Sequence, residues 1–117
     1  MQGNNRAATT AAAILRFRRA RSEILPAELF HEPAWDLLLE LFVADAQGRR
    51  LTGWQVSEQN QVPPNVMSRW LMHLTRIHLI IGDGVGDLDD ELTLSGKAFD
   101  TIERLMKEAR ILQEAII

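Results

Sequence analysis

The chain has 117 residues, a length that suits one domain with a modest core and falls short of a two-domain enzyme. The absence of cysteine excludes disulfides and thiolate zinc sites, and the net charge of -3 argues against a generic nucleic-acid binder. The sequence has neither a long apolar run nor a secretion signal, so we expect a cytoplasmic protein.

The charge is unevenly distributed. Residues 1–22 contain five Arg and no acid, whereas residues 23–45 contain six acids and no Lys or Arg. Residues 46–82 contain four Arg and one Glu, and residues 83–117 contain four basic and nine acidic residues. Positive charge is therefore concentrated in the N-terminal segment and in residues 46–82.

Residues 1–32 are predicted to form a basic helix and a linker. Residues 1–5 are polar and expected to lack structure, while a helical pattern runs from about Ala7 to Pro26. One face of this helix would carry Ile14, Phe17, Arg21 and Ile24. Its arginines could contact DNA phosphates or a partner subunit, or they could form a solvated surface, and the residues alone leave both interpretations open.

A second helix is predicted from Pro33 to about Gly48. Its apolar positions are wider than one stripe, which indicates burial on more than one side and a scaffold role under the segment that follows. They are Trp35, Leu37, Leu38, Leu39, Leu41, Phe42, Val43, Ala44 and Ala46. Residues 49–52 are then predicted to form a short strand or extended entry, and its Arg49 and Arg50 could meet a phosphate backbone.

Two short helices separated by a tight break follow. Thr52 and Gln55 have capping-box spacing at the start of a helix over about residues 53–60. Pro63-Pro64 then suits the first turn of a helix that ends near Ile77. This arrangement is a helix-turn-helix, whose second helix enters the major groove of DNA.

The second of these helices has two different faces. The predicted core face carries Met67, Trp70, Leu71, Leu74 and Ile77. The free face carries Pro64, Asn65, Ser68, Arg69, Met72, His73 and Arg76.

The remaining chain is predicted to form two strands and a helix. A strand over residues 79–81, a glycine-rich turn over 82–87 and a returning strand over 88–92 would make a two-stranded wing. Thr93 is expected to cap the last helix. The apolar stripe of that helix exceeds what one small domain needs to cover itself, and its members are Ala98, Ile102, Leu105, Met106, Ala109, Leu112 and Ile116.

The run LTGWQVSEQNQVPPNVMSRWLMHLTRIHLII (residues 51–81) resembles the helix-turn-helix of MarR-type winged-helix transcriptional regulators. Val62, Ser68-Arg69, Leu74 and Leu79-Ile80 match that family's pattern, and residues 92–96, LTLSG, are similar to its L-T-x-x-G. The resemblance covers about the last two thirds of the chain. It implies a mainly α (α+β) fold in a single structural domain: a winged helix-turn-helix over 33–93 with a two-stranded wing, flanked by the N-terminal segment 1–32 and a C-terminal dimerisation helix 94–117.

The resemblance also implies a sequence-specific duplex DNA-binding regulator that acts as a homodimer, with residues 63–77 in the major groove. Asn65 could pair with adenine, Arg69 with guanine and Val66 with a thymine methyl. Backbone contacts would come from Ser68, His73, Arg76, Arg49 and Arg50. Dimerisation is expected through Ile14, Phe17, Ile102, Leu105, Met106, Ala109, Leu112 and Ile116. Members of the family often respond to small phenolic or lipophilic ligands, but no residue set here identifies such an effector.

Three positions depart from the family pattern. The wing carries Asp83, Asp87, Asp89, Asp90 and Glu91 and no basic residue, although carboxylates facing DNA are repelled. Asn60 stands where an apolar residue is usual, and residues 63–65 replace serines and threonines. The alternative is therefore a winged-helix protein–protein interaction module whose acidic wing and partly apolar helix face, with Val66 and Met72, bind a protein instead of DNA.

No catalytic motif is present, so an enzyme is not expected. Residues 83–91 lack the ligand pattern of a calcium loop, and His31, His73 and His78 have no metal spacing beyond the five-residue gap of the last two. We therefore expect no metal and no cofactor.

Overall fold

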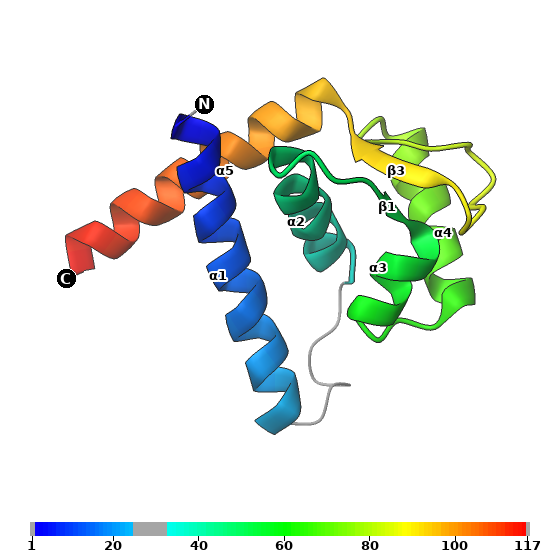
Figure 1. The fold of residues 1–117 in the computed structure, drawn as a ribbon, viewed down its shortest axis with the longest axis horizontal. Helices are drawn as coiled ribbons and strands as arrows, with labels where there is room; N and C mark the ends of the chain where they lie inside the picture. The colour runs from blue at the N-terminus through cyan, green and yellow to red at the C-terminus, as the bar shows by residue number, and fades with distance from the viewer. Residues whose placement is uncertain (1, 25–32, 117) are drawn as a thin grey trace.

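The computed structural model describes the backbone of residues 2–24 and 33–116, and the side-chain environments of residues 6–16, 19 and 34–110. Figure 1 shows the long N-terminal helix beside a shorter helix and crossed near its own N-terminus by the long C-terminal helix; the remaining helices and the strands lie at the other end of the molecule. The helices in this described part are α1 (Gln2–Ile24), α2 (Pro33–Ala46), α3 (Gly53–Gln59), α4 (Pro64–Arg76) and α5 (Gly96–Ile116). Because α1 already begins at Gln2, the expectation that residues 2–5 lack structure is wrong.

Three short strands form a small antiparallel sheet in the order β1-β3-β2. They are β1 (Leu51–Thr52), β2 (Ile80–Ile81) and β3 (Glu91–Leu94). Leu51 pairs with Leu92 and Ile80 with Leu94, and all four side chains are buried, so the sheet contributes one face to the core. The fold is therefore mostly helical with a small sheet, as expected for the coarse α+β class.

The returning strand starts three residues later than predicted. The prediction began it at Leu88, whereas β3 begins at Glu91. The reason is local: the Asp89 amide donates to Asp87 Oδ1 (2.9 Å) and the Asp90 amide to the Asp87 carbonyl (3.2 Å), which closes a turn over residues 87–90.

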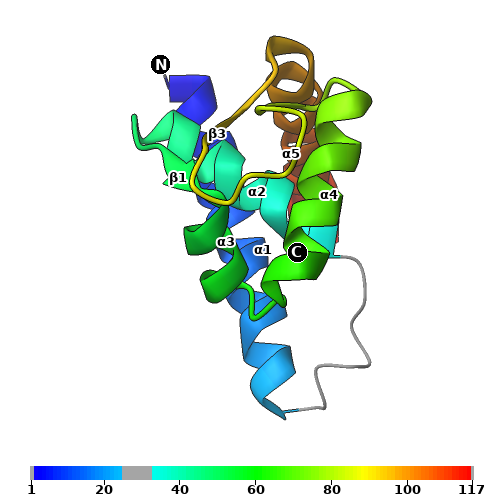
Figure 2. The same ribbon diagram turned by 90° about the vertical axis from the view of Figure 1, so that its right-hand side faces the viewer.

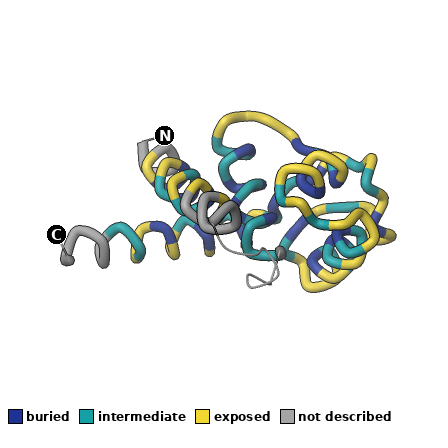
Figure 3. Tube along the Cα trace, turned by 90° about the horizontal axis from the view of Figure 1, so that it is seen from below, coloured by how far each residue is buried: buried dark blue, intermediate teal, exposed yellow. Residues whose placement is uncertain are grey.

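Helix α2 is the centre of the core, as its broad apolar surface predicts. Leu37, Leu39, Leu41 and Phe42 are fully buried, and at 100° per residue they lie on opposite sides of the helix. One side packs against α1 and the other contacts β3 and α5, where the Phe42 and Phe99 ring centroids are 4.7 Å apart. Figure 3 shows buried positions along the inner sides of the helices and exposed positions over the outer loops.

Small side chains allow α1 to approach the rest of the core closely. Among the residues of α1 whose burial is described, Ala7, Ala8, Ala11 and Leu15 are buried, and α1 packs against both α2 and α5. Arg19 of α1 forms an ion pair with Glu40 of α2, and its side chain stays 42% exposed. The predicted face of Ile14, Phe17, Arg21 and Ile24 is described only at Ile14, which is partly buried. Pro26 lies outside the described residues.

The cap of α5 is Ser95 and not Thr93. The Ala98 amide donates to Ser95 Oγ (3.1 Å), whereas Thr93 belongs to β3 and pairs with Ile81. The Thr93 hydroxyl instead donates to Asp45 Oδ2 of α2 (3.2 Å). Thr93 is thus held by the sheet and by α2, and the helix starts two residues later.

Candidate nucleic-acid interface

The start of α3 confirms the predicted capping box. The Gln55 amide donates to Thr52 Oγ1 (3.3 Å), and the Thr52 amide donates to Gln55 Oε1 (2.8 Å). At the other end Asn60 is the C-cap residue, and its side-chain Nδ2 donates to the Val56 carbonyl (2.8 Å). This bond explains how a polar residue is accommodated at a position where an apolar one is usual.

The turn between α3 and α4 is closed by Ser57. The Val62 amide donates to the Ser57 carbonyl (3.0 Å), and the Ser57 hydroxyl donates back to the Val62 carbonyl. Ser57 is buried, so this pair of bonds fixes the turn from inside and sets α4 at a defined angle to α3. Figure 2 shows the two helices joined by this short turn.

Gln61 in this turn has a strained backbone conformation, and its substitution tests the turn. Its φ is 55°, a left-handed conformation that costs a non-glycine residue about 1–2 kcal/mol. We expect Gln61→Gly to raise the free energy of unfolding by up to about 1 kcal/mol, because the relief exceeds the entropic penalty of glycine. Urea denaturation measures the change, and Gln59→Gly in the last turn of α3 is the control, which should lower stability. Destabilisation by both would contradict the assigned turn.

The N-terminal end of α4 has few amides to offer an anion. Pro64 has no N–H, and the amides of Val66 and Met67 both donate to the Pro63 carbonyl at 3.0 Å. Within the described chain this leaves the Asn65 amide as the donor of the first turn. This helix end therefore offers a phosphate fewer backbone donors than a helix N-terminus usually does.

One stripe of α4 is exposed and positively charged. Asn65, Arg69 and Arg76 are exposed at helical steps of four and seven, and His73 is exposed beside them. Among the described residues neither Arg69 nor Arg76 has an ion-pair partner. At 1.5 Å per residue these arginines lie about 10 Å apart along the helix. The stripe therefore presents an amide and two free guanidinium groups on one side.

The core face of α4 is narrower than predicted. Met67, Leu71 and Leu74 are buried, whereas Trp70 is only partly buried and Ile77 is 42% exposed. A hollow of about 350 Å³ lies beside the stripe, lined among the described residues by Val66, Arg69, Trp70 and His73. The rings of Trp70 and His73 meet edge to face with centroids 6.0 Å apart.

The loop between β2 and β3 is docked on α4, so Ser68 is not on the free face. The Ser68 hydroxyl donates to the Gly86 carbonyl (2.7 Å), and Gly86 is buried there. A Cβ at Gly86 would lie 2.7 Å from the Ser68 carbonyl oxygen and 3.0 Å from Met72 Cγ. The predicted phosphate contact of Ser68 is thus replaced by a contact within the chain.

Leu88 holds the other end of this loop. Its carbonyl accepts the Trp54 amide (3.0 Å), and a Cβ at Gly53 would lie 2.9 Å from Leu88 Cα and 3.0 Å from Leu71 Cδ1. Leu88 therefore sits close against the start of α3. Leu88 was predicted to begin the returning strand and not to anchor the loop, although a single apolar residue between two aspartates is a signal for such an anchor.

Two of the aspartates predicted for the wing shape the loop between β2 and β3. Asp83 Oδ1 accepts the amides of Val85 (2.9 Å), Gly86 (3.1 Å) and Asp87 (3.4 Å). Asp87 Oδ1 accepts the Asp89 amide, as described above. These carboxylates thus have a structural role, and the charge of Asp83 is directed at loop amides.

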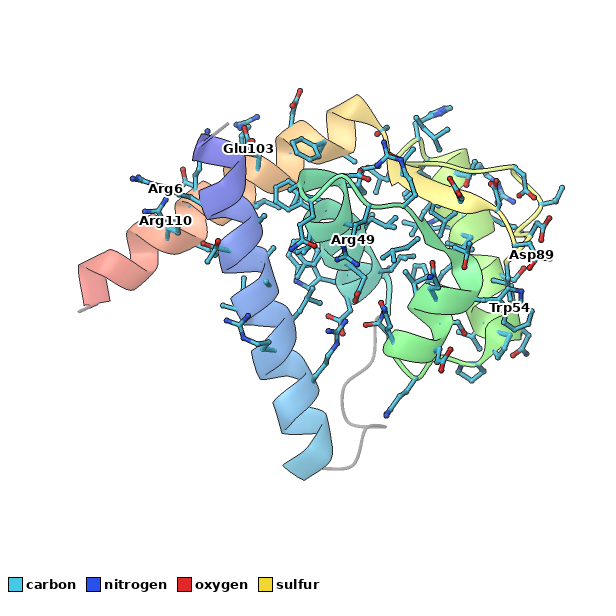
Figure 4. The ribbon with its side chains drawn as sticks, viewed as in Figure 1. Arg6, Arg49, Trp54, Asp89, Glu103 and Arg110 are labelled. Carbon is cyan, nitrogen blue, oxygen red and sulfur yellow. The ribbon has the colours of Figure 1, made fainter. Side chains whose placement is uncertain are left out.

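Arg49 and Arg50 are engaged near the end of α2. Arg50 forms an ion pair with Asp45 (3.2 Å), and Arg49 Nε donates to Gln47 Oε1 (2.9 Å). Figure 4 shows Arg49 beside α2, away from the end of the molecule where Trp54 and Asp89 lie. Both arginines are exposed, but the structure does not bring them into the stripe on α4.

The residues predicted for dimerisation divide into three groups. Ile102 and Met106 are buried within this chain, where α5 packs against α1. Leu105 is 46% exposed, and Ile14 and Ala109 are partly buried. The side chains of Phe17, Leu112 and Ile116 lie outside the described ones. Figure 4 shows Arg6 of α1 beside Glu103 and Arg110 of α5 at the crossing of the two helices.

Among the described residues, no group of three or more His, Asp or Glu side chains could hold a metal ion. No helix in the same part of the chain is both long and apolar enough to cross a membrane. Comparison of the chain with models of protein families, with curated proteins and with solved structures gives no match.

Proposed function

We propose that this chain is a MarR-type winged helix-turn-helix regulator that binds duplex DNA sequence-specifically as a homodimer in the cytoplasm. The observation that carries the proposal is the exposed stripe of Asn65, Arg69 and Arg76 on the second helix of a two-helix unit with a tight turn. The order of the elements supports the winged-helix part of this proposal. It runs from a helix and a strand through two helices to two strands joined by a loop.

The stripe suits the major groove. Asn65 would bond adenine, Arg69 would bond guanine through two parallel N–H groups, and Val66 would contact a thymine methyl. Arg76 and His73, near the C-terminal end of α4, would contact phosphates and fix the register. The wing loop is bonded to Ser68 on α4 and carries acidic residues, so it would not contact the bases. The side chains of α4 alone would then recognise each half-site.

A dimer would place two such helices about one helical turn of DNA apart. The exposed Leu105 supports an interface on α5, because a large apolar side chain at a helix surface gains by burial against a second copy.

One observation favours the alternative, a protein–protein interaction module: two large apolar side chains are exposed at and beside the wing loop. Val85 at the tip of the wing loop is 71% exposed and Ile81 of β2 is 59% exposed, and acidic residues accompany them. Such a surface fits a protein partner better than DNA. Under this alternative the acidic wing and the partly apolar face of α4, with Val66 and Met72, would form the binding surface, and Arg69 would contribute little.

The Arg69→Ala variant tests the DNA-binding function. We expect it to weaken binding to a selected site by about 1–3 kcal/mol and to relax specificity at one base position. Fluorescence anisotropy at several salt concentrations, after selection from random duplexes, measures both effects. Arg104→Ala on α5 is the matched control, because it removes one exposed arginine away from α4 and should leave affinity unchanged. Equal losses for both variants, or no DNA binding by the unmodified chain at low salt, would favour the interaction module.

A further inference from the structure

Ser95 lies at the junction between β3 and α5 and bonds to two elements at once. Its hydroxyl oxygen accepts the Ala98 amide (3.1 Å) in the first turn of α5 and donates to the His78 carbonyl (2.8 Å). The Ser95 amide donates to the Leu79 carbonyl (3.0 Å). His78 and Leu79 form the turn that follows α4, so one residue joins the start of α5 to the end of α4.

The hydrogen bonds continue from this turn into α4. The Leu79 amide donates to the Leu74 carbonyl (2.9 Å), and the His78 amide donates to the Thr75 carbonyl (3.1 Å). His78 has a φ of 64°, a left-handed conformation that a histidine keeps only where its surroundings hold it. The last turn of α4, the strained turn and Ser95 are therefore one connected unit.

Helix α2 holds the same junction from the other side. Asp45 Oδ2 accepts the Leu94 amide and the Thr93 hydroxyl, both at 3.2 Å. Phe99, whose amide donates to the Ser95 carbonyl (2.9 Å), places its ring against Phe42 of α2. The junction thus connects α2 and α5 to the turn after α4, and the Ser95 hydroxyl supplies a side-chain hydrogen bond between the start of α5 and that turn.

We propose that Ser95 is a positioning residue that fixes the angle between α5 and α4, and through it the distance between the two α4 helices of a dimer. The inference rests on the proposed function, in which α5 forms the dimer interface and α4 enters the groove. The Ser95 hydroxyl accepts one hydrogen bond from the first turn of α5 and donates another to the turn after α4. A tilt of α5 relative to α4 would therefore break one of these two bonds.

Because α5 is long, a small change in its angle to α4 moves its far end by several ångströms. Helix α5 has 21 residues, which at 1.5 Å per residue gives a length of about 30 Å. A tilt of about 10° at its first turn would move its far end by about 5 Å, which exceeds the rise of one base pair, about 3.4 Å. Loss of the Ser95 hydroxyl would therefore widen the range of half-site spacings that the dimer accepts.

The test compares Ser95→Ala and Ser95→Thr with the control Thr101→Ala. The Thr101 hydroxyl donates to the Lys97 carbonyl within α5 (2.8 Å), so its removal deletes a hydroxyl of the same helix that has no bond to the α4 turn. The DNA-binding measurement uses two kinds of duplex. One carries a single half-site selected by the unmodified chain, and the others carry two half-sites whose spacing differs by single base pairs. The DNA-independent arm is amide hydrogen exchange by NMR.

In Ser95→Ala we expect the amides of residues 77–79 and of Ala98 to exchange about five-fold faster together, because a lost hydrogen bond changes a local opening equilibrium by about this factor. The preference for the best spacing over its neighbours should fall about ten-fold, with single half-site affinity changed less than about two-fold. Ser95→Thr should restore both readouts, since threonine also caps helices. Thr101→Ala should change neither.

Three results would overturn the positioning role: faster exchange at Ala98 alone, an unchanged spacing preference, or an equal loss of affinity on all probes including the single half-site. The last result would mean that Ser95 acts on stability only. If the unmodified chain binds no duplex, the proposed function fails and the spacing role fails with it. The exchange arm then still decides whether Ser95 couples α5 to α4.

Discussion

Gly86→Ala is expected to lower the free energy of unfolding by about 2–4 kcal/mol, the sum of a left-handed backbone penalty and an overpacked contact. The φ of Gly86 is 75°, and its added Cβ would lie 2.7 Å from the carbonyl oxygen of Ser68, a backbone atom inside α4 that cannot move aside. Urea denaturation gives the size of the loss. Limited proteolysis of the loop between β2 and β3 should show new cleavage, because undocking is the easiest way for the chain to relieve the clash.

Gly84→Ala is the matched control for this variant. Gly84 lies in the same loop with a φ of 84°, but its Cβ would meet open space. It should cost only the backbone penalty of about 1–2 kcal/mol. Equal losses for the two variants would contradict the docking of the loop on α4, and with it the assignment of the Ser68 hydroxyl to Gly86.

Phe42→Ala is expected to cost about 3–5 kcal/mol, the range for removing a buried aromatic side chain and leaving a cavity. Phe42 is fully buried in α2 and packs against Phe99 of α5, so the cavity would open between two helices that both belong to the core. Thermal and urea unfolding measure the loss. A chain of this length has a small total stability, so the variant should be largely unfolded well below the unfolding temperature of the original chain.

Trp54→Ala provides the comparison for Phe42→Ala. Trp54 is larger but 49% exposed, and its backbone amide, which bonds Leu88, is retained in the variant. Its loss should cost clearly less than that of Phe42. The reverse order would place the centre of the core near α3 instead of at α2.

The bounds of α3 and α4 were predictable because their signals are local. The capping box of Thr52 and Gln55, and the proline pair before α4, act within one turn of the helices they define. The exposure of Asn65, Arg69, His73 and Arg76 follows from periodicity alone.

Two of the errors have a different cause, since each involves a contact between distant parts of the chain. Thr93 was expected to cap α5, but Asp45, 48 residues earlier, holds its hydroxyl. Ser68 was expected on the free face, but Gly86, 18 residues later, accepts its proton. Spacing within one helix carries no information about such partners.

The apolar stripe on α5 is a further case in which spacing within a helix does not identify the partner. Its apolar spacing predicted that something covers it, and Ile102 and Met106 are indeed covered. Other elements of the same chain pack against α5, chiefly α1, and a periodic pattern cannot distinguish such a cover from a second subunit. Leu105 remains the exposed member among those described, and dimerisation through α5 stays a proposal.

The order of the sheet has a consequence for how the protein behaves at high concentration. The two outer strands, β1 and β2, have two residues each, and the longer β3 lies between them. An outer strand this short offers a neighbouring molecule almost no backbone ladder to extend, which is one of the ways proteins avoid edge-to-edge aggregation. Ile81 can therefore be exposed on an outer strand without seeding fibrils, and we expect the chain to stay dispersed in concentrated solution.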